Sequence, residues 1–138
     1  MTLLRIAVGP HRFTARLEEN AAPRTCAAFR ALLPSRNTLL HARWSGEACW
    51  VPLGDFQLGA GGLENPTGLP SPGDLLFHPA DHSETEILFP YGTTRFAAQA
   101  GPLTGSHFLT IVDGRDQLAD MGRLVLWKGA QEISFETI

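Results

Sequence analysis

The 138-residue sequence has little charge, few cysteines and no long apolar run. Its 11 Lys and Arg residues are outnumbered by 14 Asp and Glu residues, and they nowhere form a basic run. The sequence therefore lacks the positive patch that binding to a phosphate backbone requires. It also lacks the ~18 consecutive apolar residues of a membrane helix. We expect neither nucleic acid nor a membrane as partner.

The two cysteines, Cys26 and Cys49, are too few for a disulfide framework, and both lie among apolar residues. No Cys-x-x-Cys pattern occurs, so we expect reduced thiols in the core of a cytoplasmic protein. Arg5 lies within the first residues and no apolar stretch follows it, so we expect no signal peptide. The glycine-rich segment 59–62 lacks the Gly-Lys-Ser/Thr ending of a phosphate loop, and we predict no cofactor.

Turn-forming residues are abundant, with 14 glycines and 10 prolines, which favours many short elements within one domain over 1–138. Apolar and polar residues alternate over 12–18, which predicts a β-strand. Residues 4–8 are predicted to form the preceding strand, so that the two strands make a β-hairpin. Pro23 opens a helical pattern that predicts the main helix over 23–33, and 115–121 predicts a short second helical turn. A loop is expected over 54–73. Further strands are predicted at 39–44, 48–53, 74–77, 84–89, 95–99, 107–112, 124–127 and 133–135. This pattern is typical of a mainly β closed barrel or sandwich.

Three stretches resemble the cyclophilins in the right order. The segment FTARLEENAAPRTCAAFRAL (13–32) is similar to their first strand and helix, and AQAGPLTGSHF (98–108) to their ANAGP…GSQF segment. DMGRLVLW (120–127) resembles a later strand that closes their barrel. WSGEA, PGDLLFHP and EILFPYG resemble small bacterial cyclophilin-like proteins of unknown function. The resemblance implies a closed barrel of about eight strands capped by helices.

Cyclophilins catalyse rotation about prolyl amide bonds, whose barrier is about 18–20 kcal/mol, with an Arg that donates to the imide nitrogen. Alignment on Gly54 and Asp55 places Trp44 at the position of that Arg and Pro52 at the position of a pocket Gln. Arg43 is one residue away, which in a strand is the opposite face. The catalytic positions are thus largely replaced, and efficient isomerase activity is not expected.

The second half of the implied pocket differs too. His107 stands where cyclophilins have Gln, Leu109 replaces Phe, and Gln99 replaces Asn. Arg95 and Gln99 lie four residues apart on one expected strand, hence on one face, which would adjoin His107. The enzyme alternative is a prolyl isomerase that uses Arg43 or Arg95 as its donor.

We predict instead that the barrel face binds a small molecule or a short peptide. An Arg and a Glu would orient a polar group between indole walls. The predicted ligand-binding residues are Arg43, Trp44, Glu47, Trp50, Arg95, Gln99 and His107. Two other interpretations remain: core tryptophans beside a surface ion pair, or a homo-oligomer whose interface includes Trp127.

His78, His82, Glu84 and Glu86 are rich in metal-ligand types. A His-x-x-x-His pair binds zinc when a helix brings both rings to one side. Pro79 lies between the two histidines and indicates a turn, so we predict no metal site.

Overall fold

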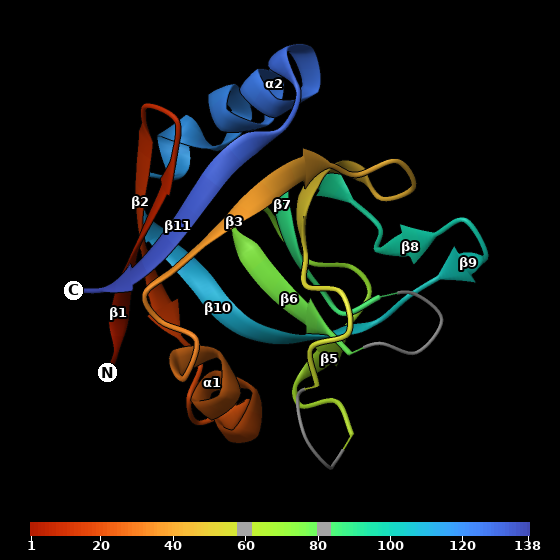
Figure 1. Ribbon diagram of the computed structural model, residues 1–138. Helices are drawn as coiled ribbons and strands as arrows, with labels where there is room; N and C mark the ends of the chain where they lie inside the picture. Colours follow the sequence, from red (N-terminus) through yellow and green to blue (C-terminus); the bar gives the residue numbers. More distant parts are fainter. Residues whose placement is uncertain (58–61, 80–83) are drawn as a thin grey trace.

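Eight antiparallel strands form a closed barrel in the computed structural model, which describes residues 1–57, 62–79 and 84–138 (Figure 1). Their order around the described barrel is β2-β1-β11-β3-β4-β7-β6-β10, and pairing of β10 with β2 closes it. The barrel strands are β1 (Leu3–Val8), β2 (His11–Leu17), β3 (Ser35–His41), β4 (Gly46–Pro52), β6 (Asp74–His78), β7 (Glu86–Thr94), β10 (Gly105–Asp113) and β11 (Gln131–Thr137). The predicted mainly β closed barrel is confirmed.

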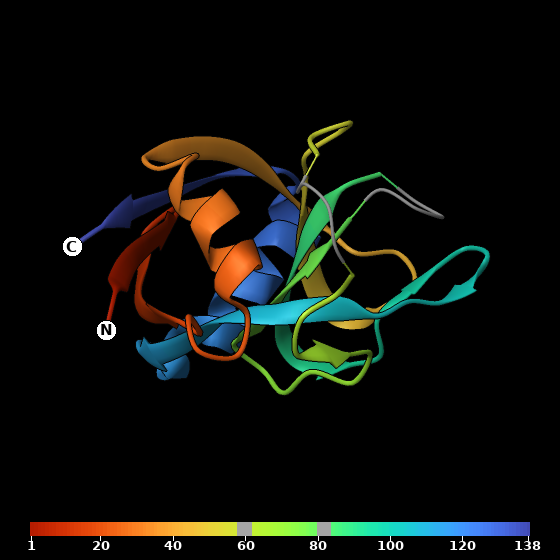
Figure 2. The same cartoon turned by 90° about the horizontal axis from the view of Figure 1, so that it is seen from below.

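Three short strands lie outside this ring. β5 (Pro66–Thr67) pairs with β10, and it is the one strand within the described part of the predicted 54–73 loop. β8 (Ala97–Ala98) and β9 (Gly101–Pro102) form a small hairpin. This hairpin projects from the barrel on the side away from both chain termini (Figures 1 and 2). Residues 58–61, which include two of the glycines considered above, lie outside the described residues.

The first hairpin shows how the sequence pattern builds the barrel wall. Ile6 of β1 lies opposite Phe13 of β2, and both side chains are buried. Their neighbours along each strand point outward because successive side chains alternate between faces. The predicted hairpin is therefore confirmed.

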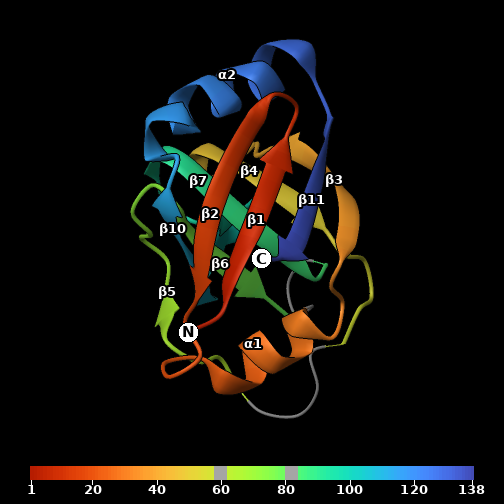
Figure 3. The ribbon, with the colours of Figure 1, turned by 90° about the vertical axis from the view of Figure 1, so that its left-hand side faces the viewer.

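Helix α1 (Pro23–Arg30) and helix α2 (Leu118–Lys128) lie at opposite ends of the barrel (Figure 3). Pro23 occupies the first turn of α1, where its missing N–H is not needed. Phe29 enters the barrel end and makes edge-to-face contacts with Phe108 at 5.1 Å and Phe135 at 5.2 Å between ring centroids. Burial of such a ring contributes roughly 1.5–3 kcal/mol, so Phe29 helps to hold α1 on the barrel, together with the buried Thr25 and Cys26. The helix predicted over 23–33 is confirmed in position, although it ends at Arg30; the prediction that it is the main helix is wrong, because α2 is longer, with 11 residues against 8.

The prediction of a strand over 124–127 is wrong, because these residues form the last turns of α2. The short helical turn predicted over 115–121 is instead a 3₁₀ turn (Arg115–Gln117) that leads into this 11-residue helix. Leu118, Met121 and Val125 recur at helical spacing and are buried together. A run of four apolar residues cannot distinguish a strand from a buried helix. Trp127 on the outer side of α2 is 77% exposed.

Two other strand boundaries shift in ways that matter for the site. β3 ends at His41, so residues 42–45 form a turn and not the predicted end of a strand. The strand predicted over 95–99 shrinks to the two residues of β8.

Cys26 and Cys49 are free and buried, as predicted. Burial raises the pKa of each thiol to about 12, so neither is ionised near neutral pH.

Gly122 of α2 packs directly against Tyr91 of β7. A Cβ atom at this position would overlap the Tyr91 ring. We expect Gly122→Ala to destabilise the protein by about 1–2 kcal/mol, because overpacking outweighs the better helix propensity of alanine. Urea unfolding measures this change. In a Tyr91→Ala background the same substitution should become neutral or stabilising. A stabilised Gly122→Ala single variant would contradict the observed packing.

Candidate functional site: a cleft on the outer face of the barrel

A cleft of about 750 Å³ lies on the outer face of the barrel, between the β3–β4 turn and the β8–β9 hairpin. Its floor follows from strand alternation. Leu40 of β3 lies opposite Trp50 of β4, which in turn lies opposite Leu88 of β7, and all three side chains line the cleft. Ala98 and Leu103 line it from the β8–β9 side. Apolar side chains from three adjacent strands thus form a floor that the hairpin only partly covers.

Ser45 holds the two walls of the cleft together. Its hydroxyl donates to the Ala97 carbonyl and accepts from the Ala97 N–H, both at 3.1 Å. The Arg95 N–H donates to the Ser45 carbonyl, also at 3.1 Å. The Ser45 side chain is buried, so these bonds are shielded from water. Sequence reasoning missed this residue, because a serine in a turn is too common to indicate a specific role.

Four of the seven predicted binding residues line the cleft: Arg43, Trp44, Trp50 and Gln99. Arg43 and Trp44 were expected on opposite faces of a strand, and that expectation is wrong. The strand ends at His41, so both side chains belong to a turn, where alternation does not apply, and both reach the cleft. The Trp44 side chain is 53% exposed at the rim, whereas Trp50 is half-buried in the floor.

Glu47 and Arg95 do not line the cleft. The Glu47 carboxylate accepts a hydrogen bond from the Thr93 N–H at 2.9 Å and lies against Gly92, so it holds the C-terminal end of strand β7. The Arg95 side chain is exposed and makes no hydrogen bond or ion pair with any residue in the described ranges. The prediction that Arg95 and Gln99 share one strand face is wrong, because β8 includes neither residue.

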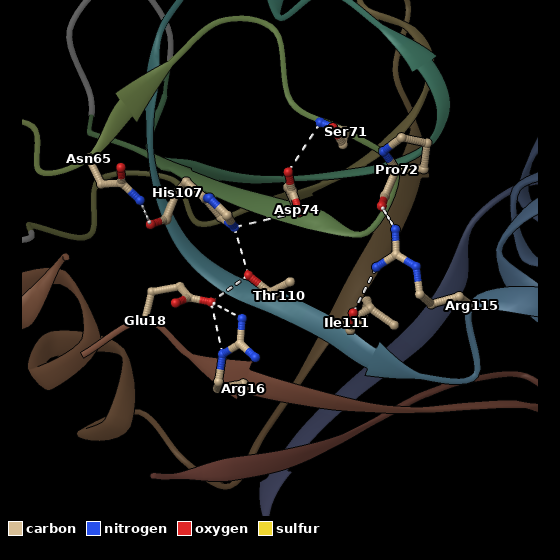
Figure 4. A network of polar contacts seen from close by, with 10 residues as sticks. All are labelled: Arg16, Glu18, Asn65, Ser71, Pro72, Asp74, His107, Thr110, Ile111 and Arg115. Atoms are coloured by element: carbon tan, nitrogen blue, oxygen red, sulfur yellow. Dashed lines mark hydrogen bonds and ion pairs between the residues drawn. The ribbon is translucent and has the colours of Figure 1, made fainter. Parts of the chain in front are cut away.

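His107 lies outside the cleft because β10 contains a bulge. The register of β10 against β6 shifts between His107 and Leu109, and this shift turns His107 and Thr110 toward the same outer face. His107 Nε2 lies 2.8 Å from the Thr110 hydroxyl and 3.7 Å from an Asp74 carboxylate oxygen (Figure 4). The expectation that His107 adjoins Gln99 is therefore wrong, since a bulge is not visible in the sequence pattern.

The Thr110 hydroxyl continues this network to β2. It donates to Glu18 at 2.7 Å, and the Arg16 guanidinium donates to the same Glu18 oxygen at 2.9 Å (Figure 4). Because the single hydroxyl proton goes to Glu18, His107 Nε2 must donate to Thr110. Burial raises the pKa of Glu18, but the hydrogen bonds from Thr110 and Arg16 outweigh this and leave it below its usual range. The network joins β2, β6 and β10.

A second polar pair links the cleft to α2. His41 lines the cleft, and its Nδ1 lies 2.8 Å from the Ala42 carbonyl, to which it donates. In the neutral imidazole the other nitrogen, Nε2, then accepts from the Tyr91 hydroxyl at 2.7 Å. Burial is the main cause that raises the pKa of Tyr91. Fifty residues separate His41 from Tyr91, so no local pattern could have revealed the pair.

Glu86 and His78 lie opposite each other on β7 and β6, and both are buried. Glu86 lines the end of the cleft that lies opposite the end lined by Arg43. His78 Nδ1 lies 2.8 Å from the Thr104 carbonyl, and its ring packs edge-on against Phe96. Within the described ranges no three His, Cys, Asp or Glu side chains are grouped as metal ligands would be. His82, which was considered with them, lies outside those ranges.

These features define a small closed β-barrel with a partly apolar cleft on its outer face. The chain belongs to DUF3830, a family described as a protein of unknown function, whose model matches residues 4–137. No curated protein matches the chain. In the described part of the chain, no helix combines the length and apolar character needed to cross a membrane.

Among the solved structures that are similar to this chain, two illustrate the shared fold at low sequence identity. The structure of McbB in complex with tryptophan is 20% identical with a TM-score of 0.75, and the match covers 96% of this chain but 44% of McbB. The chain thus spans less than half of that protein. The hypothetical protein AF2241 from Archaeoglobus fulgidus is 19% identical with a TM-score of 0.59, and the match covers 99% of this chain and 95% of AF2241.

The network around Thr110 predicts a pH-dependent contribution to stability. We expect Thr110→Val to lower the free energy of unfolding by about 1–2 kcal/mol near neutral pH. The pKa of Glu18 is lowered in the folded state, so its contribution is present above its unfolded pKa and is lost as the pH falls through its folded pKa. The difference between variant and wild type should therefore shrink below pH ~4.

Urea unfolding between neutral and acidic pH measures this difference. Thr38→Val makes the same change at an exposed position of β3 and serves as the control. A loss of stability that stays constant with pH, or that matches the control, would show that Thr110 does not support the Glu18 carboxylate.

Proposed function

We propose that this protein binds a small molecule or a short peptide segment in the outer cleft, without efficient prolyl isomerase activity. The observation that carries the proposal is the cleft itself. Its volume of about 750 Å³ lies within the roughly 300–1,000 Å³ of ligand pockets, and a few polar groups surround an apolar floor. Leu40 and Trp50 are only partly buried in this floor, beside the almost fully buried Leu88, and their exposed apolar surface favours an apolar ligand group.

The McbB structure supports this proposal. McbB forms a complex with tryptophan, so a protein that contains this fold binds an amino acid. The present chain corresponds to less than half of McbB and is 20% identical, so the ligand is not carried over. An amino-acid-sized or slightly larger ligand is compatible with the volume of the cleft.

We also infer that the barrel is cyclophilin-like. The support is the sequence resemblance, the closed eight-strand order of the described barrel, and the meeting of Arg43, Trp50 and Gln99 in one cleft. A cytoplasmic location agrees with cysteines that are buried and unpaired. On this reading the cleft occupies the face where cyclophilins bind peptides.

Prolyl isomerase activity is the second candidate, because Arg43 lines the cleft and could donate to an imide nitrogen. Arg95, the other candidate donor, does not line it. His107 replaces a pocket residue of the family and lies in the network around Thr110. We therefore expect a protease-coupled assay on a chromogenic Ala-Pro-Phe peptide to give the uncatalysed rate. A clear catalysed rate that Arg43→Gln removes would instead establish the enzyme alternative.

Tryptophan fluorescence tests binding directly, because Trp44 and Trp50 line the cleft while Trp127 lies on α2. In a Trp127→Phe protein, we expect saturable changes with 3-phenylpropionate, 3-phenylpropanamide or a blocked Ala-Pro-Phe peptide. We expect dissociation constants of ~1 mM for ligands of this size. Ala98→Leu, which narrows the cleft, should weaken binding.

Ala119→Leu is the matched control, since it makes the same change on the exposed side of α2. The proposal is overturned if none of the three probes gives a saturable signal. It is also overturned if Ala98→Leu and Ala119→Leu leave binding equally strong.

A further inference from the structure

The cleft has an arginine at one end and a glutamic acid at the other, and the two are well separated. The Ala42 N–H donates to the Ala48 carbonyl at 2.9 Å, which places the turn carrying Arg43 beside the start of β4. Glu86 lies opposite Pro52, four residues further along β4. At about 3.3 Å per residue this separation is about 13 Å along the strand. The apolar floor lies between the two ends, so the Arg43 end of the cleft is distinctly positive.

The Arg43 guanidinium has no competing partner among the described residues. Most other arginines there donate to a carboxylate or a carbonyl, such as Arg30 to Glu19 and Arg123 to Asp120, each at 2.8 Å. Arg43 is exposed, lines the cleft and makes no hydrogen bond or ion pair within the described ranges. Its five N–H donors are therefore free to bind a ligand that enters the cleft.

The charge at this end matches an anion with a single negative charge. Of the described residues that line the cleft, Arg43 alone has a permanent positive charge. His41 adds no free donor, because Nδ1 donates to the Ala42 carbonyl and Nε2 lies 2.7 Å from the Tyr91 hydroxyl. A planar guanidinium fork binds a carboxylate through two parallel hydrogen bonds. The neighbouring floor residues Leu40 and Trp50 favour an apolar group beside that carboxylate.

We propose that the cleft selects ligands in which a carboxylate adjoins an apolar or aromatic group, with Arg43 binding the carboxylate. This inference rests on the proposed binding function and specifies the ligand class. A free carboxylic acid and the C-terminal residue of a peptide share this chemistry. In either case the apolar group lies over Leu40, Trp50 and Leu88, and Glu86 at the far end stays clear of the carboxylate.

The experiment compares an acid with its neutral amide. Fluorescence titration of the Trp127→Phe protein with 3-phenylpropionate and 3-phenylpropanamide should show about five- to tenfold tighter binding of the acid, as one partly screened Arg–carboxylate pair allows. Arg43→Gln should reduce the ratio of the two affinities to about one. The same pair of measurements on an Ala-Pro-Phe peptide, with a free or an amidated C-terminus, distinguishes the two sources of the carboxylate.

Arg95→Gln provides the matched control. Arg95 is also exposed and without a side-chain partner in the described ranges, it is joined to Ser45 through its backbone, and it does not line the cleft. Its loss removes the same charge and should leave the preference for the acid intact. A preference that falls equally in both variants would reflect the general field of the protein and overturn the assignment to Arg43.

The two proposals fail in different ways. If the acid and the amide bind equally well to the wild-type cleft, the carboxylate inference is wrong and the binding function stands. If neither of these compounds nor the blocked Ala-Pro-Phe peptide binds, the binding function fails together with the inference. A preference for the acid that Arg43→Gln abolishes supports both.

Discussion

Burial on both faces of β4, β6 and β7 is the constraint on which the rest of this structure depends. The inward side chains, such as Cys49, Phe77 and Phe89, fill the barrel. The outward side chains include Leu88, which is almost fully buried although it points away from the barrel interior. Apolar surface on the outside must be covered, at roughly 25 cal/mol per Å². The β8–β9 hairpin and Leu103 cover part of it, and the remainder is the cleft.

The cleft and the polar network around Thr110 occupy different strands and have different roles. The network joins β2, β6 and β10 through side chains that satisfy one another, and this is how polar groups support a fold. At the cleft rim, by contrast, Arg43 has no partner within the described ranges. His41 connects the cleft wall through Tyr91 to Gly122 of α2, so the shape of the cleft is tied to the packing of a helix.

The sequence predicted the elements whose signals are local. The alternation over 12–18 and the proline at the start of α1 lead directly to β2 and α1. The sequence-based predictions were wrong where contacts between distant residues or irregularities of the backbone determine the structure. The apolar run 124–127 is helical because Met121 and Val125 pack together on the barrel, and the bulge in β10 redirects His107. Four of the seven predicted site residues meet in the cleft because the segments that carry them adjoin in the barrel, and Ser45 and His41 were missed.

A titration followed by the NMR shifts of backbone amides tests most directly whether the outer cleft is the functional site. With 3-phenylpropionate added to ¹⁵N-labelled protein, we expect the largest saturable shifts in the turn at 42–45 and in the hairpin at 97–100, the two walls joined through Ser45. Residues of β10 around His107 should change little, since they lie in the separate network. Shifts centred on β10, or shifts that are not localised, would contradict the account.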